Sequence, residues 1–427
     1  MFGLLVNWLK TGCRGRLGWG AVLGGLLLSS GLAARGQVRP FQLRWPHVRQ
    51  ATLPLLVERN MPLVELYLNG QGPYRFLLDT GVGVSMITDP ALADVLHLNR
   101  GQPISIAGLG QDAPLRAYLC AGVRVRLGPA EAPTLPLLLL SDDVFNLSAY
   151  VGLPVHGILG YDLFQSFVVT LRPRTAELVL HAPDRYRAPR GRRWRRVPLE
   201  LEQQRAYVAA AVAQTDAAVD TLRLLLDTGA GHALSLETSS DPRVRLPSLR
   251  VRNDLGRGLG GIIHGFLGRV RQIQLAGYAL PQVLTSYPDS ADVATRVRVA
   301  RSGNVGFELL RRFDVVIDYA HRQLLLRPNR HYDRPFEQDM TGMELVAAGP
   351  ELRRYLINSI RAGSPAEQAG LCPGDEVLAV NLLPAGSFSL SQLALLFRTQ
   401  DRRQVLLLVR HPDGELFVAQ LVLARAI

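Results

Sequence analysis

The chain has 427 residues, which corresponds to about three domains of average size. Hydrophobic residues make up 48% and charged residues 20%, a balance that excludes a disordered, collagenous or disulfide-scaffold protein. The net charge of +12 would suit a nucleic-acid ligand. However, Lys10 is the only lysine among the 48 basic residues, and the arginines are interleaved with acidic residues and apolar strands. They are not gathered with stacking aromatics, so we expect no nucleic-acid binding.

Residues 1–36 are predicted to be a secretory signal peptide. Basic residues precede the apolar stretch 20–34, and Ala34-Arg35-Gly36 resembles a small-x-small cleavage site. An uncleaved anchor is the alternative, but the apolar stretch is shorter than the roughly 20 residues of a membrane-spanning helix. We therefore expect a secreted or periplasmic protein with no stable membrane span after cleavage.

A duplication organises the middle of the chain. The motif Leu-Leu-Asp-Thr-Gly at 77–81 recurs at 225–229, and the segment 160–164 is answered by 306–310. The aspartate and the later glycine are 81 residues apart in the first copy and 79 in the second. A single tripeptide match would mean little, whereas two copies with matching flanks at matching spacing indicate an internal repeat.

Both copies are predicted to be all-β, with paired strands before each Asp-Thr-Gly motif and glycine-rich hairpin tips after it. The expected strands are 64–68, 74–78, 207–212 and 221–226, the expected short helices are 89–96 and 307–311, and the tips lie at 108–110 and 256–261. The predicted organisation is a first lobe at 37–189, a basic interlobe linker at 190–196, a second lobe of six or so strands at 197–330, a linker at 331–340 and a C-terminal domain at 341–427.

The C-terminal domain is predicted to be a small mixed unit. It should contain a strand at 355–360, a short helix within 362–371 that ends at a glycine, a strand within 374–381, an amphipathic helix at 389–398 and a terminal hairpin of 405–409 with 416–422.

The repeated motif carries a specific chemistry. An apolar strand that ends in Asp-Thr-Gly places a carboxylate at a sharp bend, which the glycine permits. One such motif would most simply be a turn aspartate, but two related copies can bring Asp79 and Asp227 together. Two adjacent carboxylates share one proton, so one of them can activate a water molecule while the other donates to a carbonyl oxygen. This chemistry needs no metal and no cofactor.

These residues resemble those of aspartic proteases. The later apolar-apolar-glycine element of that family corresponds to Ile158, Leu159 and Gly160 in the first copy and to Val305 and Gly306 in the second. The C-terminal domain looks like a PDZ domain around Gly363-Ser364-Pro365-Ala366 and Gly374-Asp375. The whole resembles bacterial secreted retropepsin-like aspartyl proteases with two lobes and a C-terminal PDZ domain.

The resemblance implies a mainly β fold in which two related lobes form a pseudo-dimer, so that a monomer is sufficient for catalysis. It assigns the catalytic dyad to Asp79 and Asp227, support of the dyad to Thr80, Gly81, Thr228 and Gly229, and the flaps over the substrate to Gly108, Leu109, Gly110, Gly258, Gly260 and Gly261. The implied substrate is an extended peptide, and a second peptide C-terminus is expected at the PDZ domain along 355–360.

Three positions leave alternatives open. Val82 follows the first motif where pepsin-type enzymes have serine or threonine, and Asn304 replaces an apolar residue before Val305. His232 could tune the dyad, although a histidine with a purely structural role is the simpler interpretation. Because of Val82, the alternative function is a catalytically degenerate protease fold that acts as a scaffold through its PDZ domain.

Overall fold

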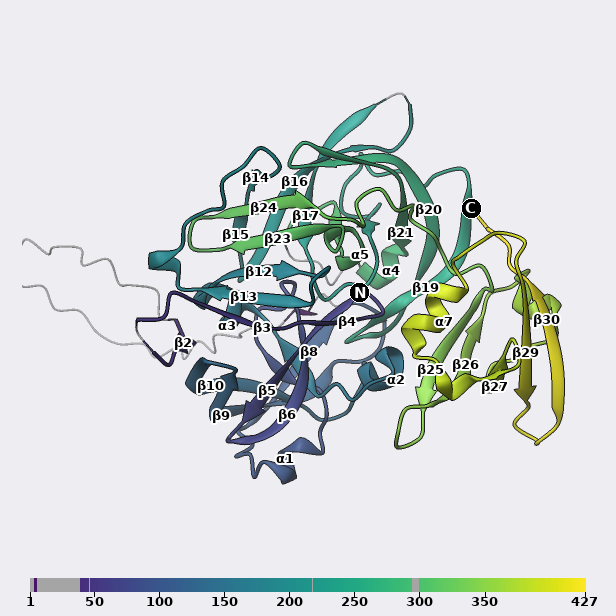
Figure 1. Cartoon of the computed structure of the whole chain (residues 1–427), viewed down its shortest axis with the longest axis horizontal. Coiled ribbons are helices and arrows are strands. Elements are labelled where there is room, and N and C mark those ends of the chain that lie inside the picture. The colour runs from purple at the N-terminus through teal and green to yellow at the C-terminus, as the bar shows by residue number, and fades with distance from the viewer. Residues whose placement is uncertain (1–3, 6–38, 46, 217, 294–298) are drawn as a thin grey trace, which may run out of the picture.

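The computed structural model describes residues 4–5, 39–45, 47–216, 218–293 and 299–427. Within these residues the protein is mainly β, with short helices between the strands (Figure 1). The expected signal peptide at 1–36 lies outside the described residues, apart from Leu4 and Leu5. None of the helices in the described ranges is long and apolar enough to span a membrane.

The first sheet contains the strands that lead into and support the first Asp-Thr-Gly motif. In spatial order it comprises β4 (Leu56–Glu58), β5 (Met61–Leu68), β6 (Gln71–Leu78), β11 (Gly157–Leu159), β7 (Met86–Ile87), β10 (Ala130–Leu140), β9 (Leu115–Leu127), β8 (Pro103–Gly108) and β1 (Leu4–Leu5), with β2 (Gln42–Leu43) paired to β10. An additional pairing of β9 with β5 curls the sheet back on itself.

The second sheet has eight strands, in the same order as eight strands of the first sheet; β1 and β2 have no counterpart in it among the described residues. It comprises β15 (Glu200–Glu202), β16 (Arg205–Ala213), β17 (Val219–Leu226), β22 (Gly303–Val305), β18 (Leu234–Leu236), β21 (Tyr278–Pro288), β20 (Gly261–Leu275) and β19 (Arg250–Gly258). The additional pairing of β16 with β20 corresponds to that of β5 with β9. Each sheet is larger than the six or so strands expected from the sequence, because very short strands such as β7 and β11 complete the ladders.

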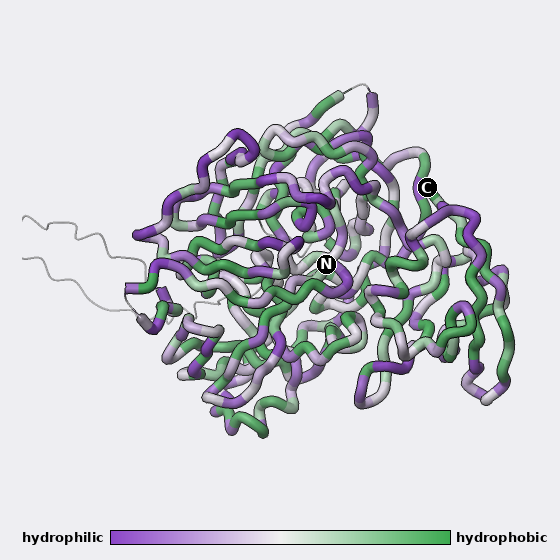
Figure 2. The backbone as a smooth tube through the Cα atoms, in the orientation of Figure 1, coloured by the Kyte–Doolittle hydropathy of each residue, from purple (hydrophilic) through white to green (hydrophobic). Residues whose placement is uncertain are grey.

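A third sheet joins the two copies. Its order is β14 (Arg195–Pro198), β24 (Gln323–Pro328), β23 (Phe313–Asp318), β12 (Val168–Arg172), β13 (Glu177–His181) and β3 (Gln50–Pro54). Strands β12 and β23 pair antiparallel, with Thr170 opposite Val316, which are equivalent positions of the repeat. These strands contain consecutive apolar residues (Figure 2), such as Val315, Val316 and Ile317, and every residue of β23 is buried. Burial on both faces of the sheet explains the continuous rather than alternating hydrophobicity.

The segment between the copies differs from the expected linker at 190–196. Strand β14 begins at Arg195, so the end of this segment belongs to the joining sheet. Arg195 also donates to the carbonyl of Gly277, and Arg193 donates to that of Pro328. Arg193 and Arg195 of this basic cluster therefore bond to backbone carbonyls of the second copy.

The helices are short and lie at strand ends. They are α1 (Leu92–Val95), α2 (Leu147–Val151), α3 (Tyr161–Ser166), α4 (Ser290–Val293), α5 (Phe307–Leu310), α6 (Pro365–Gln368) and α7 (Leu390–Leu396). Helices α3 and α5 follow Gly160 and Gly306, which are equivalent in the repeat. The helix expected at 89–96 is shorter, and α2, α3 and α4 were not expected.

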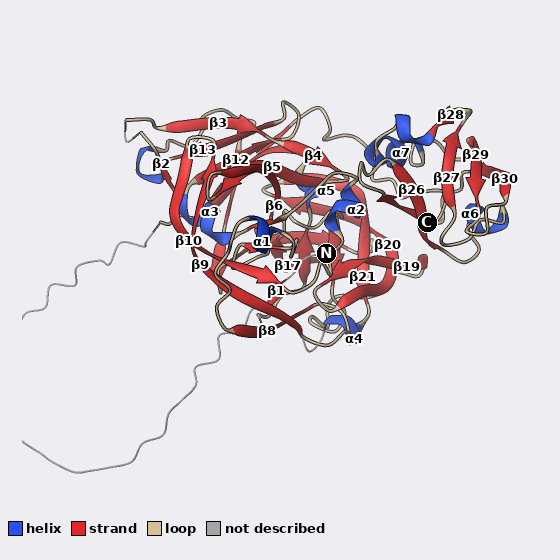
Figure 3. Ribbon diagram, turned by 90° about the horizontal axis from the view of Figure 1, so that it is seen from below, coloured by secondary structure: helices blue, strands red, loops and turns tan. Residues whose placement is uncertain are grey.

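The C-terminal domain has its own core and lies at one side of the two larger sheets (Figure 3). Its sheet has the order β25 (Met343–Ala348), β26 (Arg354–Ile360), β27 (Glu376–Val380), β29 (Gln404–Arg410) and β30 (Leu416–Val422), with β28 (Leu383–Pro384) on β27. Met340, placed in the expected linker 331–340, is fully buried in this core. Strand β25 was not expected, although its residues alternate between buried and half-buried.

Candidate active site

Each Asp-Thr-Gly turn is held by its own short parallel strand. Strand β6 ends immediately before Asp79, whose N–H donates to the carbonyl of Leu159 over 3.0 Å. In the same way, β17 ends before Asp227, whose N–H donates to the carbonyl of Val305 over 3.0 Å. The apolar-apolar-glycine elements named from the sequence therefore support the backbone of the two aspartates, and Gly160 and Gly306 follow them directly.

The two threonines hold the turns together across the molecule. The N–H of Thr80 donates to Oγ1 of Thr228 over 3.0 Å, and the N–H of Thr228 donates to Oγ1 of Thr80 over 3.1 Å. The hydroxyl of Thr80 donates to the carbonyl of Leu226, and the hydroxyl of Thr228 donates to the carbonyl of Leu78. Each hydroxyl thus reaches the residue before the opposite aspartate. Four reciprocal bonds between buried groups therefore fix the position of one turn relative to the other.

The structure brings the two carboxyl groups close together. Asp79 and Asp227 are both fully buried, and a Cβ atom at Gly81 would lie 3.0 Å from Oδ1 of Asp79 and 3.1 Å from Oδ1 of Asp227. At this proximity the negative charge of one carboxylate opposes ionisation of the other, so we expect the pair to share one proton. The glycine at position 229 is needed here, because a Cβ atom at that position would lie 2.3 Å from Cγ of Asp79. Gly81 donates its N–H to Oδ1 of Asp79 over 2.6 Å.

The surroundings of the two carboxyls are unequal. Burial raises the pKa of Asp79 well above its usual value, and the negative charge of Asp227 raises it further. Burial also raises the pKa of Asp227, but a hydrogen bond from the side-chain amide of Asn304 opposes this rise. The proton is shared by the pair, and the hydrogen bond from Asn304 favours negative charge on Asp227.

Asn304 is a site residue that the sequence reasoning treated only as a departure from a pattern. Its Nδ2 donates to Oδ2 of Asp227 over 2.7 Å, and its Oδ1 lies 3.0 Å from Nε2 of His232. Burial lowers the pKa of His232 to about 3, so its ring is neutral and can donate Nε2–H to the amide oxygen. His232 thereby orients the amide toward the carboxylate. The sequence does contain a signal for Asn304, because it is an amide residue in a segment that was expected to be a buried apolar strand.

Two further residues link the lobes beside the dyad and were not found from the sequence. Nε of Arg205 donates to the carbonyl of Gly81 over 2.9 Å, and Nδ2 of Asn60 donates to that of Gly231 over 3.0 Å. Each therefore holds the aspartate turn of the opposite copy. Both are buried. Arg205 is the first residue of β16, and Asn60 immediately precedes β5. Their sequence positions gave no indication of this cross-lobe role.

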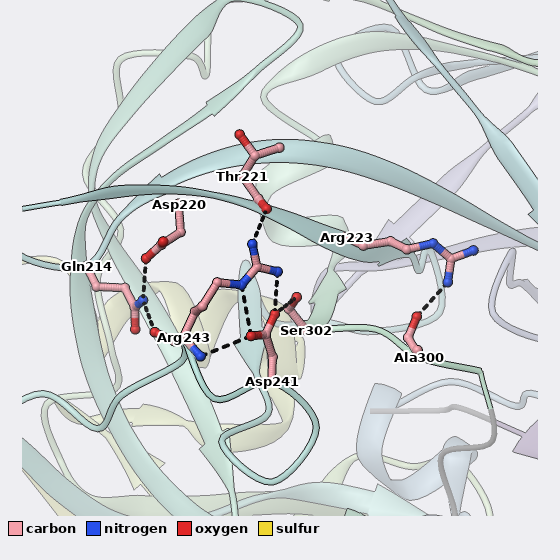
Figure 4. A network of polar contacts seen from close by, with 8 residues as sticks. All are labelled: Gln214, Asp220, Thr221, Arg223, Asp241, Arg243, Ala300 and Ser302. Atoms are coloured by element: carbon pink, nitrogen blue, oxygen red, sulfur yellow. Dashed lines mark hydrogen bonds and ion pairs between the residues drawn. The ribbon is translucent and has the colours of Figure 1, made fainter.

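A polar network lies near the start of β17 and just before β22 (Figure 4). Asp241 accepts two hydrogen bonds from the guanidinium of Arg243 and one from the hydroxyl of Ser302, which precedes strand β22. Arg243 also donates to the carbonyl of Thr221 in β17. The guanidinium of Arg243 lowers the pKa of Asp241 to about 2. The network thus joins the two strands that position Asp227.

The glycine-rich tips meet above the two lobes. Gly110 of the β8–β9 hairpin forms a bridge with Gly260 of the β19–β20 hairpin, and the N–H of Gly260 donates to the carbonyl of Leu109 over 2.8 Å. A Cβ atom at Gly110 would lie 2.0 Å from the Gly260 carbonyl oxygen, and the backbone there has a φ of +108°. Gly108 and Gly258 end the rising strands, and Gly261 starts the returning strand β20.

Val82 does not obstruct the carboxyls. Its side chain is fully buried in an apolar cluster with Met61, Met86 and Ile158, and its carbonyl accepts from the N–H of Tyr161. The valine thus packs against the strand behind the first turn.

Two segments of the chain match known protein families. Residues 64–163 match the family described as aspartyl protease, and residues 356–411 match the PDZ domain family. The chain contains an aspartyl protease domain and a C-terminal PDZ domain. The first match includes Asp79 and the segment 158–160, whereas the second Asp-Thr-Gly motif lies beyond it.

Individual relatives are distant. A stretch of 117 residues is 25% identical to the 26S proteasome non-ATPase regulatory subunit 9 of Drosophila melanogaster, covering 26% of this chain and 53% of that protein, so the chain spans about half the length of this curated relative. Among solved structures, an aspartic proteinase from Irpex lacteus matches at a TM-score of 0.39 and 12% identity, over 67% of this chain and 99% of that one. A photosystem II D1 C-terminal processing protease matches at a TM-score of 0.18 and 24% identity, over 19% and 22%.

The described residues contain no group of three or more histidine, cysteine or acidic side chains placed to hold a metal ion. The chemistry that the site can perform with its own residues is general acid–base catalysis by the carboxyl pair.

Proposed function

We propose that this chain is an aspartic endopeptidase whose dyad is Asp79 and Asp227. The observation that carries the proposal is the pair of fully buried, neighbouring carboxyls on two turns that the threonines bond to each other. The matching strand order of the two sheets and the pairing of Thr170 with Val316 support a pseudo-dimer of two related lobes, so that one chain supplies both aspartates.

The substrate in this proposal is an extended peptide. Its backbone would lie between the dyad and the two flap hairpins, whose tips are bonded to each other through Gly110 and Gly260. Opening of this contact admits the peptide, and its closure excludes water other than the nucleophile. The glycines at the tips allow the close approach that closure requires.

The reaction uses the unequal protonation of the dyad. Ionised Asp227 takes a proton from a water molecule, whose oxygen attacks the carbonyl carbon of the scissile amide, while Asp79 gives its proton to the carbonyl oxygen. The resulting diol collapses when Asp227 returns its proton to the amide nitrogen and Asp79 takes one from a diol hydroxyl. The C–N bond breaks, a carboxylic acid and an amine leave, and the dyad regains its starting state.

The amide of Asn304 supports the base in this scheme. It stabilises the negative charge on Asp227 before each turnover, and neutral His232 keeps the amide in the donating orientation. Arg205 and Asn60 hold the two turns in register, which keeps the carboxyls at the short separation that proton sharing needs.

The test is cleavage of a broad peptide library by the purified chain across pH, with and without a pepstatin-type inhibitor. Asp79→Asn and Asp227→Asn should each abolish cleavage, and Asp94→Asn should not, because Asp94 is an exposed partner of Arg100 remote from the dyad. A chain that cleaves nothing, or dyad variants that cleave normally, would instead favour the scaffold function.

We also propose that the chain acts outside the cytoplasm as a monomer, after loss of residues 1–36. Sequencing of the N-terminus of the exported protein and its mass in solution test these two points. Export without cleavage, or a stable dimer, would contradict them.

A further inference from the structure

The PDZ domain is attached to the protease domain through the edge of its sheet. Strand addition needs a free strand edge, but β26, which contains the expected peptide strand at 355–360, pairs with β25 along its length and with β27 at Tyr355 and Leu356. The edge strand is β25, which lies next to helix α7 (Figure 1). The expectation of peptide addition at 355–360 is therefore wrong, because that strand is internal to the sheet.

The space between β25 and α7 is filled by the protease domain. Arg59, at the turn from β4 to β5, donates its N–H to the hydroxyl of Ser391 in α7 and its guanidinium to the carbonyl of Leu345 in β25, each over 2.9 Å. The same guanidinium donates to the carbonyl of Tyr150 and stacks on the tyrosine ring. Ser391 also donates to Glu58. Hydrogen-bonding groups that a bound peptide could use are thus satisfied within the chain.

This attachment places the β25–β26 hairpin beside the second flap hairpin and the loop that follows Asp227. A cavity of about 120 Å³ lies between the two domains. Its walls come from the dyad loop, the second flap hairpin and the PDZ domain, among them Gly231, Leu255, Ile262, Glu344, Val346 and Asn358. Gly231 lies four residues after Asp227, and Leu255 and Ile262 flank the flap tip. The cavity therefore lies between the loop that follows Asp227, the second flap hairpin and the PDZ domain.

The charged residues that line this cavity indicate which class of ligand it can bind. Glu344 is half-buried, accepts a hydrogen bond from Asn358 over 2.8 Å, and forms no ion pair among the described residues. It also borders an adjoining cavity of about 650 Å³, which is lined by four acidic and four arginine side chains. Among the described residues that line the smaller cavity, Arg257 is the only arginine, and its guanidinium donates to the carbonyl of Val144. A carboxylate with a neutral partner thus faces the cavity.

We propose that the PDZ domain forms a distal subsite of the protease cleft, in which Glu344 binds a lysine or arginine side chain of the substrate peptide. The PDZ domain then acts as a fixed wall that determines specificity, held by Arg59 and Ser391. The proposal rests on the proposed function for the path of the peptide, but binding at Glu344 does not require the chemical step. A partly exposed carboxylate–cation pair of this kind contributes up to about fivefold in affinity.

The test measures binding to the full chain carrying Asp227→Asn, with fluorescent peptides of one sequence in which lysine or glutamate is moved through every position. At one position remote from the cleavage site, the lysine peptide should bind about threefold to fivefold more tightly than the glutamate peptide. Glu344→Gln should remove this preference and Glu344→Arg should reverse it. Glu351→Arg, on the exposed turn of the same hairpin, should retain it.

Different results would overturn the endopeptidase proposal and the subsite proposal. Cleavage by the wild-type chain together with a preference that ignores residue 344 would overturn the subsite and leave the endopeptidase intact. A preference that follows residue 344 without any cleavage would sustain the subsite and overturn the endopeptidase. Equal effects of Glu344→Arg and Glu351→Arg, or no peptide binding at all, would also overturn the subsite.

Discussion

Replacement of Asn304 by leucine should raise the pKa of Asp227 and move the acid side of the activity profile to higher pH. The amide donates to a buried carboxylate over 2.7 Å, and such a charge-assisted bond is worth about 1.5–3 kcal/mol. At about 1.4 kcal/mol per pKa unit, the acid limb should rise by about 1–2 units. The sign follows because the amide stabilises only the ionised form, which is the form that activates water.

The assay is kcat/KM for one peptide measured from acid to neutral pH, in the wild type and in Asn304→Leu. Ser235→Ala is the matched control, because Ser235 lies opposite Asn304 on strand β18 and its buried hydroxyl has no partner in the described part of the chain. The control should keep the wild-type profile. An unchanged acid limb in Asn304→Leu, or a shift to lower pH, would refute the reasoning.

The role of His232 is tested by comparing single and double variants of His232 and Asn304. If it acts only by orienting Asn304, then His232→Ala should shift the acid limb in the same direction as Asn304→Leu, and should add nothing to the double variant. Additive shifts would show that His232 acts on the dyad by another route.

Three further changes test the supporting structure. Thr80→Val should lower the free energy of unfolding by about 2–3 kcal/mol in denaturant titrations, since the two buried interlobe bonds of the Thr80 hydroxyl are lost. Thr88→Val, whose hydroxyl has no partner among the described residues, should cost much less, and equal losses would contradict the role of the threonine bonds. Gly110→Ala should raise KM with little change in Tm, because its Cβ would clash with the opposite flap tip; an unchanged KM would mean that the tips need not meet. Asp241→Asn should cost about 1–2 kcal/mol at pH 7, since Arg243 holds the pKa of Asp241 near 2. That contribution is present above the ordinary value of 3.8 and disappears as the pH falls toward 2, so a Tm difference that grows on acidification would contradict it.

The two aspartate turns could be predicted because their signal is local and repeated. Two Asp-Thr-Gly turns with apolar flanks placed Asp79 and Asp227 at strand ends, and the later elements at 158–160 and 305–306 do support them. The terminal hairpin strand at 416–422 matches the expected range, because alternating residues between turn signals define a strand within a short window.

The remaining features depend on contacts between distant parts of the chain. Arg205 reaches Gly81 and Arg59 reaches Leu345, over separations that no local pattern records. Asn304 was visible as an amide in an apolar strand, but its partner became evident only when β22 was placed beside β17. The attachment of the PDZ domain likewise follows from which edge of its sheet is free, which depends on strand β25 that the sequence reasoning had missed.

The most direct measurement of the central claim is the pH dependence of kcat/KM for peptide cleavage by the wild-type chain. Ionised Asp227 and protonated Asp79 are both required, so activity should rise through the pKa of Asp227 and fall through that of Asp79, and burial should place both limbs above the range of ordinary carboxyls. Both limbs should vanish in Asp79→Asn and Asp227→Asn because activity itself is lost. A profile that is flat across this range, or that persists in either variant, would contradict the shared-proton dyad.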